Sequence, residues 1–236
     1  AFVLLVSTII PIYFKNMATA AGVSAADSTA YLSYAISIST IIVALLGPIL
    51  GAVADNRNHK KPLFTFFLMM GVLGLAALGL SGSYLAFLVI FVIAKVGLGG
   101  SLIFYDSMLV DVTTDERMDE VSSHGYAWGY IGSCVPFIAS LLLVLNAGSI
   151  GMTSGTATMI AFFINAVWWG AVTLPLLKNY EQKFYVESKK GTIKSAFERL
   201  SGIWNEMKQD KKVFLFLLSF FFYIDGVYTI IEMGTA

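Results

Sequence analysis

The sequence has little charge and almost no cysteine, and both shortages narrow the class of protein. Only 13% of its 236 residues are Asp, Glu, Lys or Arg, whereas 57% are hydrophobic. Soluble domains carry about 25% charged residues, so this chain lacks the charge to cover a water-exposed surface. Cys134 is the single cysteine and lies in an apolar stretch, which excludes a disulfide or a cysteine-based metal site within these residues.

Signatures of enzymatic chemistry are missing as well. His59 and His124 have no cysteine or second histidine at ligand spacing, so no metal site is expected. Gly97, Gly99 and Gly100 lie within an apolar run, without the strand–turn–helix pattern of a phosphate loop. We therefore expect no enzyme, no cofactor, no metal and no nucleic-acid partner.

Long apolar runs occupy most of the chain. A helix that crosses a bilayer needs about 20 mostly apolar residues. Seven apolar segments can be drawn, at 1–14, 30–54, 63–81, 84–109, 125–147, 157–177 and 213–234. The runs are continuous rather than alternating, which favours helices over the strands of a barrel. The sequence predicts an all-α, polytopic transmembrane helix bundle.

Both ends of the chain lie in apolar sequence. As a helix, the segment 1–14 spans roughly 21 Å, which is less than the roughly 30 Å of the hydrocarbon core. The last apolar run stops close to Ala236. We expect a fragment of a longer protein that is embedded in the lipid bilayer.

Lys and Arg are distributed unevenly among the connections. The second, fourth and sixth connections hold 13 of the 15 Lys and Arg residues, and an excess of these residues marks cytoplasmic loops. We expect these even-numbered connections to face the cytoplasm, including the long linker at 178–212. Apolar residues at helical spacing predict an amphipathic helix at 193–207 within the linker.

The second connection carries a recognisable loop motif. A glycine is followed by an aspartate and then by paired basic residues; the motif residues are Gly51, Asp55, Lys60 and Lys61. This pattern resembles the loop signature of the major facilitator superfamily, with Asn58 where a glycine is usual. We expect Asp55 to pair with Arg117 of the fourth connection and to latch one transport state.

Three further stretches narrow the resemblance; they are residues 104–111, 121–132 and 223–230. Together they resemble the vacuole-effluxer family of that superfamily, although Asp106 stands where an asparagine is expected. The resemblance implies about twelve helices in two lobes. Here it implies a six-helix lobe at 1–177, a cytoplasmic linker at 178–212 and the first helix of a second lobe at 213–236, and the second-lobe helices beyond the seventh are missing. It also implies a secondary transporter that works by alternating access on a small polar metabolite such as an amino acid, coupled to an ion or a proton.

Charged residues inside the apolar segments indicate a transport path. Lys95 lies near the middle of its segment, where a charge is expensive unless it faces the bundle interior or a wet cavity. Asp106 lies three helical turns further on and shares its face. Asp225 either carries a proton or caps a break in the seventh helix. We expect Lys95, Asp106 and Asp225 to line one path, with Tyr105 and Tyr228 beside them; the rival interpretation is a non-transporting sensor, scaffold or lipid-handling protein.

Small residues predict close helix packing at two places. Gly125, Gly129 and Gly132 share one face of the fifth segment, where they allow a neighbouring helix to approach. A similar set lies in the third segment at Gly71, Gly74 and Gly79.

Overall fold

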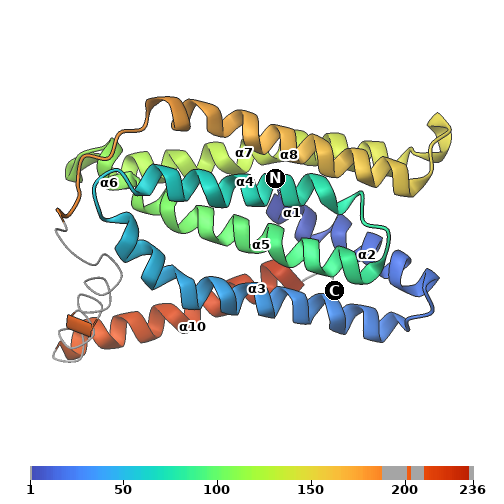
Figure 1. Cartoon of the computed structure of the whole chain (residues 1–236), viewed down its shortest axis with the longest axis horizontal. Coiled ribbons are helices and arrows are strands. Elements are labelled where there is room, and N and C mark those ends of the chain that lie inside the picture. The colour runs from blue at the N-terminus through green and yellow to red at the C-terminus, as the bar shows by residue number, and fades with distance from the viewer. Residues whose placement is uncertain (1, 188–200, 203–209, 234–236) are drawn as a thin grey trace.

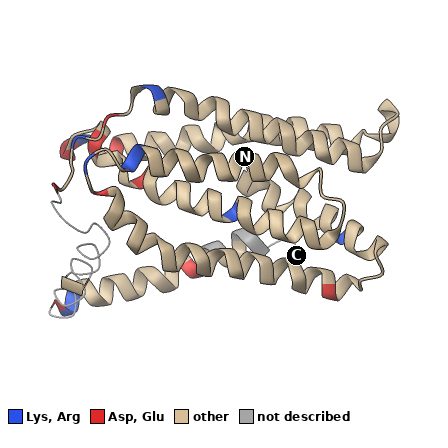
Figure 2. Cartoon of the chain, viewed as in Figure 1, with Lys and Arg blue, Asp and Glu red and all other residues tan. Residues whose placement is uncertain are grey.

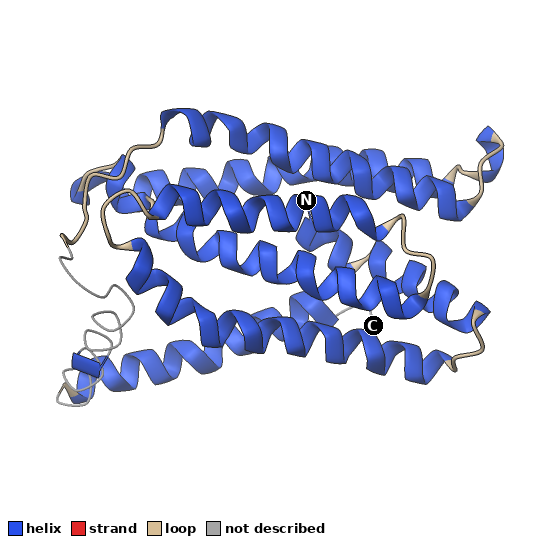
Figure 3. Ribbon diagram, viewed as in Figure 1, coloured by secondary structure: helices blue, strands red, loops and turns tan. Residues whose placement is uncertain are grey.

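The computed structural model describes residues 2–187, 201–202 and 210–233, and all the regular elements in these ranges are helices (Figures 1 and 3). In chain order they are α1 (Phe2–Ser7), α2 (Ile9–Ala20), α3 (Ala25–Ala54), α4 (Lys60–Leu78), α5 (Tyr84–Ser107), α6 (Leu109–Val112), η1 (Asp115–Arg117), α7 (Met118–Leu145), η2 (Gly148–Ile150), α8 (Ser154–Asn179) and α10 (Lys211–Met233). The all-α prediction is confirmed. The predicted amphipathic helix at 193–207 lies outside the described residues.

Polar caps at the start of three long helices fix where these helices begin. The side chain of Ser24 accepts a hydrogen bond from the backbone N–H of Asp27, and Ser83 caps α5 in the same way. Thr153 caps α8 by accepting from the backbone N–H of Thr156. Such caps satisfy N–H groups that have no partner within the helix, and they leave the apolar residues that follow free to continue as one long helix.

Among the described residues, five stretches are long and apolar enough to cross a membrane: α3, α4, α5, Asp115–Leu145 and α8. The first helix differs from its prediction, because it breaks at Thr8 and continues as α2 to Ala20 instead of ending near residue 14. Backbone hydrogen bonding thus carries the helix beyond the apolar run, past Lys15 and Asn16. The chain is a multi-pass membrane protein.

The long helices run beside one another along the longest axis of the molecule (Figure 1). The most extensive contact joins α4 to α5, and further contacts join α3 to α5, α7 to α8 and α4 to α8. Helix α10 contacts α1. Helices α3 and α7 leave most of their surface uncovered by the described residues, so α4 and α5 form the packed centre of the bundle.

Glycine allows the close contact between α4 and α5. A Cβ atom added to Gly97 would lie 2.6 Å from the Cα of Gly71, and one added to Gly74 would lie 2.8 Å from the Cβ of Ala94. Real side chains do not approach so closely, so the two backbones meet where no side chain stands between them. The prediction of tight packing in the third apolar segment is confirmed.

Aromatic rings fill the interior on either side of this contact. One cluster contains the fully buried Phe14, Phe87, Phe91 and Phe162, with Phe14 and Phe87 stacked at 5.5 Å between ring centroids. A second cluster lies where α3, α4 and α5 approach α8, and it includes Phe64, Phe67, Phe104, Met108 and Tyr180. Tyr180 thereby joins the end of α8 to the end of α5.

Charged residues gather at one end of the bundle (Figure 2). This end holds the α3–α4 connection, α6, η1, the segment after α8 and the start of α10 (Figure 1). At this charged end, the residues of the loop motif therefore lie beside residues that are far away in the sequence.

Candidate functional site

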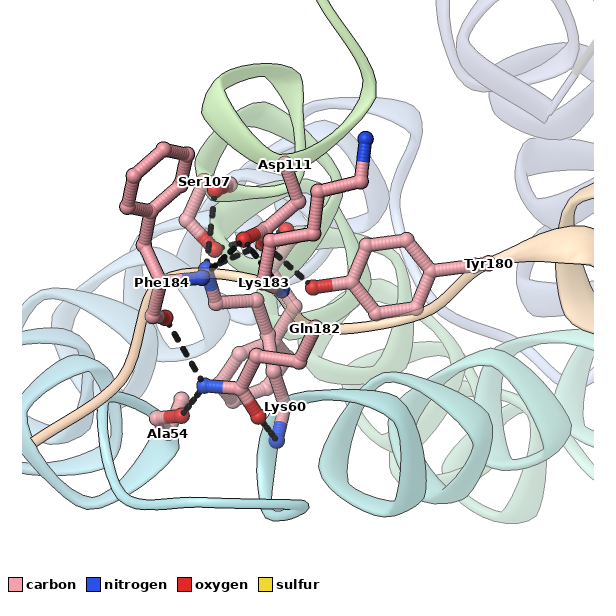
Figure 4. A network of polar contacts seen from close by, with 9 residues as sticks. Ala54, Lys60, Ser107, Asp111, Tyr180, Gln182, Lys183 and Phe184 are labelled. Atoms are coloured by element: carbon pink, nitrogen blue, oxygen red, sulfur yellow. Dashed lines mark hydrogen bonds and ion pairs between the residues drawn. The ribbon is translucent and has the colours of Figure 1, made fainter. Parts of the chain in front are cut away.

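A buried ion pair lies at the centre of the charged end. The Nζ atom of Lys60, the first residue of α4, is 2.9 Å from Oδ2 of Asp111 in α6. The two side chains are only 4% and 0% exposed. Lys60 also donates to the backbone oxygen of Ser107, at 3.0 Å (Figure 4). The lysine thus ties the start of α4 to the end of α5 and to α6.

The segment that follows α8 supplies the other partners of Asp111; residues 180–186 are called the strap below. The backbone N–H groups of Lys183 and Phe184 donate to Oδ1 of Asp111 at 3.0 and 2.9 Å. The hydroxyl of Tyr180 donates to Oδ2 at 2.5 Å (Figure 4). Both carboxylate oxygens therefore have two donors each, three of the four from the strap.

The strap is also bound to the α3–α4 connection. Gln182 donates from Nε2 to the backbone oxygen of Ala54 at 3.0 Å, and the N–H of Val186 donates to the oxygen of Asp55 at 2.8 Å. Asn56 and Val186 form an isolated parallel bridge. On the exposed side, Lys61 donates to the oxygen of Tyr180 at 3.3 Å, and the guanidinium of Arg57 lies 5.2 Å from the ring centroid of Tyr185.

These contacts determine the ionisation of the buried groups. Burial raises the pKa of Asp111, but hydrogen bonds from Phe184, Tyr180, Lys60 and Lys183 outweigh it and hold that pKa below its ordinary value. The pKa of Tyr180 is raised far above its ordinary range by burial and by the Asp111 carboxylate. At neutral pH Asp111 is therefore an anion and Tyr180 a neutral hydrogen-bond donor.

The buried pair resists opening. Removing one partner of a buried ion pair costs about 3–5 kcal/mol, because the other charge stays buried without compensation. The nearby pair between Arg117 and Glu120 is exposed at both side chains and spans 3.2 Å. Pairs of that kind contribute about 0–1 kcal/mol. The contact that fixes this end of the bundle is therefore Lys60–Asp111.

The expected latch between Asp55 and Arg117 is not formed in this arrangement. Arg117 pairs with Glu120, and in the part of the chain that the structure describes no ion pair links it to Asp55. Asp55 ends α3, and its backbone oxygen accepts from the strap. Asn58 has φ 61°, in the left-handed region that glycine adopts freely and asparagine tolerates, as its place in the loop motif leads one to expect.

Comparison with known proteins assigns the chain to a family. The family model "Vacuole effluxer Atg22 like" matches residues 21–117 and 110–235. The chain belongs to this vacuole effluxer-like family. It is 43% identical to a protein of Bacillus subtilis (strain 168) described as "Uncharacterized MFS-type transporter YxiO", over the whole of this chain. The chain spans 56% of that protein's length. No solved structure matches the chain.

The predicted path residues of this effluxer-like chain lie apart from the strap. Lys95 is half-buried on α5, and Tyr105 and Asp106 are exposed near the end of the same helix. Asp225 is exposed on α10. Asp106 and Asp225 make no ion pair among the described residues. The side chain of Tyr228 lies outside the description, so a shared path through all five residues stays a prediction.

The glycines predicted on the fifth apolar segment lie on α7. A Cβ added to Gly129 or Gly132 would meet no described atom within 4 Å, and one added to Gly125 would be 3.7 Å from the hydroxyl of Tyr105. The close helix contacts among the described residues use Gly71, Gly74 and Gly97 instead. Close packing of another helix on the α7 glycines stays a prediction for the longer effluxer-like protein.

Sequence reasoning missed three members of the site: Asp111, Tyr180 and Gln182. Asp111 carried a signal, because it directly follows an apolar helix and belongs to a stretch that resembles the family. Tyr180 and Gln182 carried none, since their partners Asp111 and Ala54 are 69 and 128 residues away in the chain. Only the folded bundle brings them together.

Proposed function

We propose that the full-length protein is a secondary transporter of the major facilitator type, moving a small polar metabolite such as an amino acid by alternating access. The observation that carries the proposal is the match of nearly the whole chain to a vacuole effluxer-like family. The relative described as an MFS-type transporter supports the same class. Coupling to an ion or a proton would supply the energy, with the charged end of the bundle facing the cytoplasm.

The charges inside the spans support transport over a passive scaffold. A charge at the centre of a membrane helix costs about 2.5–3.5 kcal/mol on the insertion scale. Lys95 lies twelve residues into the 24-residue helix α5, so its charge is kept near the middle of the span. A protein that only anchors or scaffolds has no use for a charge with this insertion cost, whereas a path for a polar solute needs polar groups at this depth.

The proposal is tested on the purified full-length protein with a ligand screen. Amino acids, short peptides and nucleosides are added separately, and the melting temperature is measured for each. We expect amino acids to raise it, and a stabilising amino acid to enter proteoliposomes that contain the protein. Stabilisation by nucleosides or peptides alone would contradict the substrate class, and no uptake of any stabilising compound would favour the non-transporting sensor or scaffold.

A variant of Lys95 supplies the matched test of the path. Lys95→Met removes the charge and keeps the length of the side chain, so we expect normal expression and loss of uptake. Leu88→Met is the control, because Leu88 lies two helical turns earlier on the same face of α5. Normal uptake by Lys95→Met would show that Lys95 is not required for transport.

A further inference from the structure

The strap is attached along its whole length. Tyr180, Lys183 and Phe184 donate to Asp111, while Gln182 and Val186 donate to the backbone at the end of α3. Figure 4 shows Tyr180, Gln182, Lys183 and Phe184 gathered around Asp111 and Ala54. A segment that merely connected two lobes would not need a hydrogen bond at five of seven consecutive residues.

We propose that the strap is a permanent part of the first lobe and that Asp111 holds it closed in every conformation that the transporter adopts. The rigid first lobe then ends near residue 186 rather than at residue 177, where the apolar sequence stops. The proposal goes beyond alternating access, because it states which residues of the chain move together.

The burial of the carboxylate is the reason for permanence. The side chain of Asp111 has no exposed surface. Each of its two carboxylate oxygens accepts two hydrogen bonds, three of them from the strap and one from Lys60. Opening the strap removes three donors from a buried anion and leaves Lys60 as its single side-chain partner. The loss of three hydrogen bonds to an anion lowers an open population by a factor of roughly 100 or more. The exposed pair Arg117–Glu120 meets no such barrier, since water replaces each partner.

Hydrogen–deuterium exchange of the full-length protein in lipid nanodiscs tests the proposal without a substrate. The readout is the exchange rate of peptides that cover residues 180–187. In the wild type we expect protection that lasts far longer than the seconds of a transport cycle. Asp111→Ala removes the shared acceptor and is expected to speed exchange roughly 10- to 100-fold. Asp115→Ala, an exposed acid on the same side of the bundle, is the control and should leave exchange unchanged.

A milder variant keeps the test decisive if Asp111→Ala fails to fold. Tyr180→Phe deletes one donor to Asp111 and keeps the ring in the second aromatic cluster, so exchange should rise by a smaller factor than in Asp111→Ala. Complete exchange of the wild-type strap within seconds would overturn the proposal. So would protection that neither variant weakens, because Asp111 would then not be what holds the strap. Neither result depends on finding a transported compound.

Discussion

Lys60 and Asp111 show how the same residue types acquire different roles at one end of this bundle. Both are buried and paired with each other, whereas the acids and bases of η1 and the start of α7 are exposed. Charge alone therefore does not mark the residues that stabilise the fold. The residues that stabilise the fold are marked by the number of hydrogen-bond donors directed at each carboxylate, and Asp111 has four.

Removal of Lys60 is expected to destabilise the protein strongly. Lys60→Met leaves Asp111 buried without its cation and should lower the free energy of unfolding by about 3–5 kcal/mol. Arg117→Gln breaks the exposed pair and should lower it by about 1 kcal/mol or less. Denaturant titration of both variants in detergent measures the difference. Equal losses would show that the Lys60–Asp111 pair is no stronger than a surface pair.

The stabilisation by Asp111 is expected to be independent of pH near neutrality. Its pKa is lower in the folded protein than the ordinary value of about 3.9, so its contribution is fully present above that value. It is lost as the pH falls through the lowered pKa. The stability difference between the wild type and Asp111→Ala should stay constant from about pH 5 to 8 and shrink below about pH 4. A difference that already changes near pH 6 would contradict this ionisation.

The helices α4 and α5 can approach closely because glycines at their contact carry no side chains. Adding one methyl group at Gly97 forces the backbone of α4 away, because its nearest atoms belong to Gly71 and Met70 rather than to a flexible side chain. Gly97→Ala should lower the free energy of unfolding by about 1–3 kcal/mol through overpacking, and the melting temperature should fall with it. Gly148→Ala adds the same methyl group where no atom lies within 4 Å and should have little effect. A similar shift for both variants would argue against the close contact.

An element could be predicted from the sequence when the residues that determine it lie close together along the chain. The long helices follow from local apolar runs, and Ser24, Ser83 and Thr153 cap three of them within four residues. The break at Thr8 and the extension of α2 to Ala20 were not foreseen, because apolar content marks the bilayer-spanning part and not the end of a helix. The strap was missed for another reason. Residues 180–186 have no periodic pattern, and their hydrogen bonds to Asp111, Ala54 and Asp55 go to residues at least 69 positions away.

The loop motif lies at the candidate site, but the expected pair of Asp55 and Arg117 is not formed in this structure, and the latch of one transport state stays a prediction. Lys60 of the motif is indeed a centre of contacts, and Asn58 has the backbone conformation of a glycine. The partner of Lys60, Asp111, was not foreseen. A pairing across the bundle depends on how α4, α5 and α8 pack, and no spacing within a single segment encodes that packing.

At the scale of the whole molecule, the collection of charge at one end predicts how the chain sits in the membrane. Ser149 is exposed in η2 and Asp119 is exposed at the start of α7. In a Cys134→Ser background, a membrane-impermeant maleimide should label Ser149→Cys on intact cells. It should label Asp119→Cys only after the membrane is opened, because we propose that the end rich in Lys and Arg faces the cytoplasm. The opposite labelling pattern would reverse the proposed orientation.

The close contact between α4 and α5 also bears on how the chain enters the membrane during synthesis. The two helices are joined by a short connection, from Gly79 to Ser83, so they leave the ribosome together and can meet as a hairpin before α7 exists. Contacts between neighbours in sequence form early, since little chain entropy is lost in closing them. Such a hairpin enters the bilayer as one unit, and the apolar residues of both helices then offset the insertion cost of Lys95. We therefore expect Gly71 and Gly97 to matter already while the chain is inserted into the membrane.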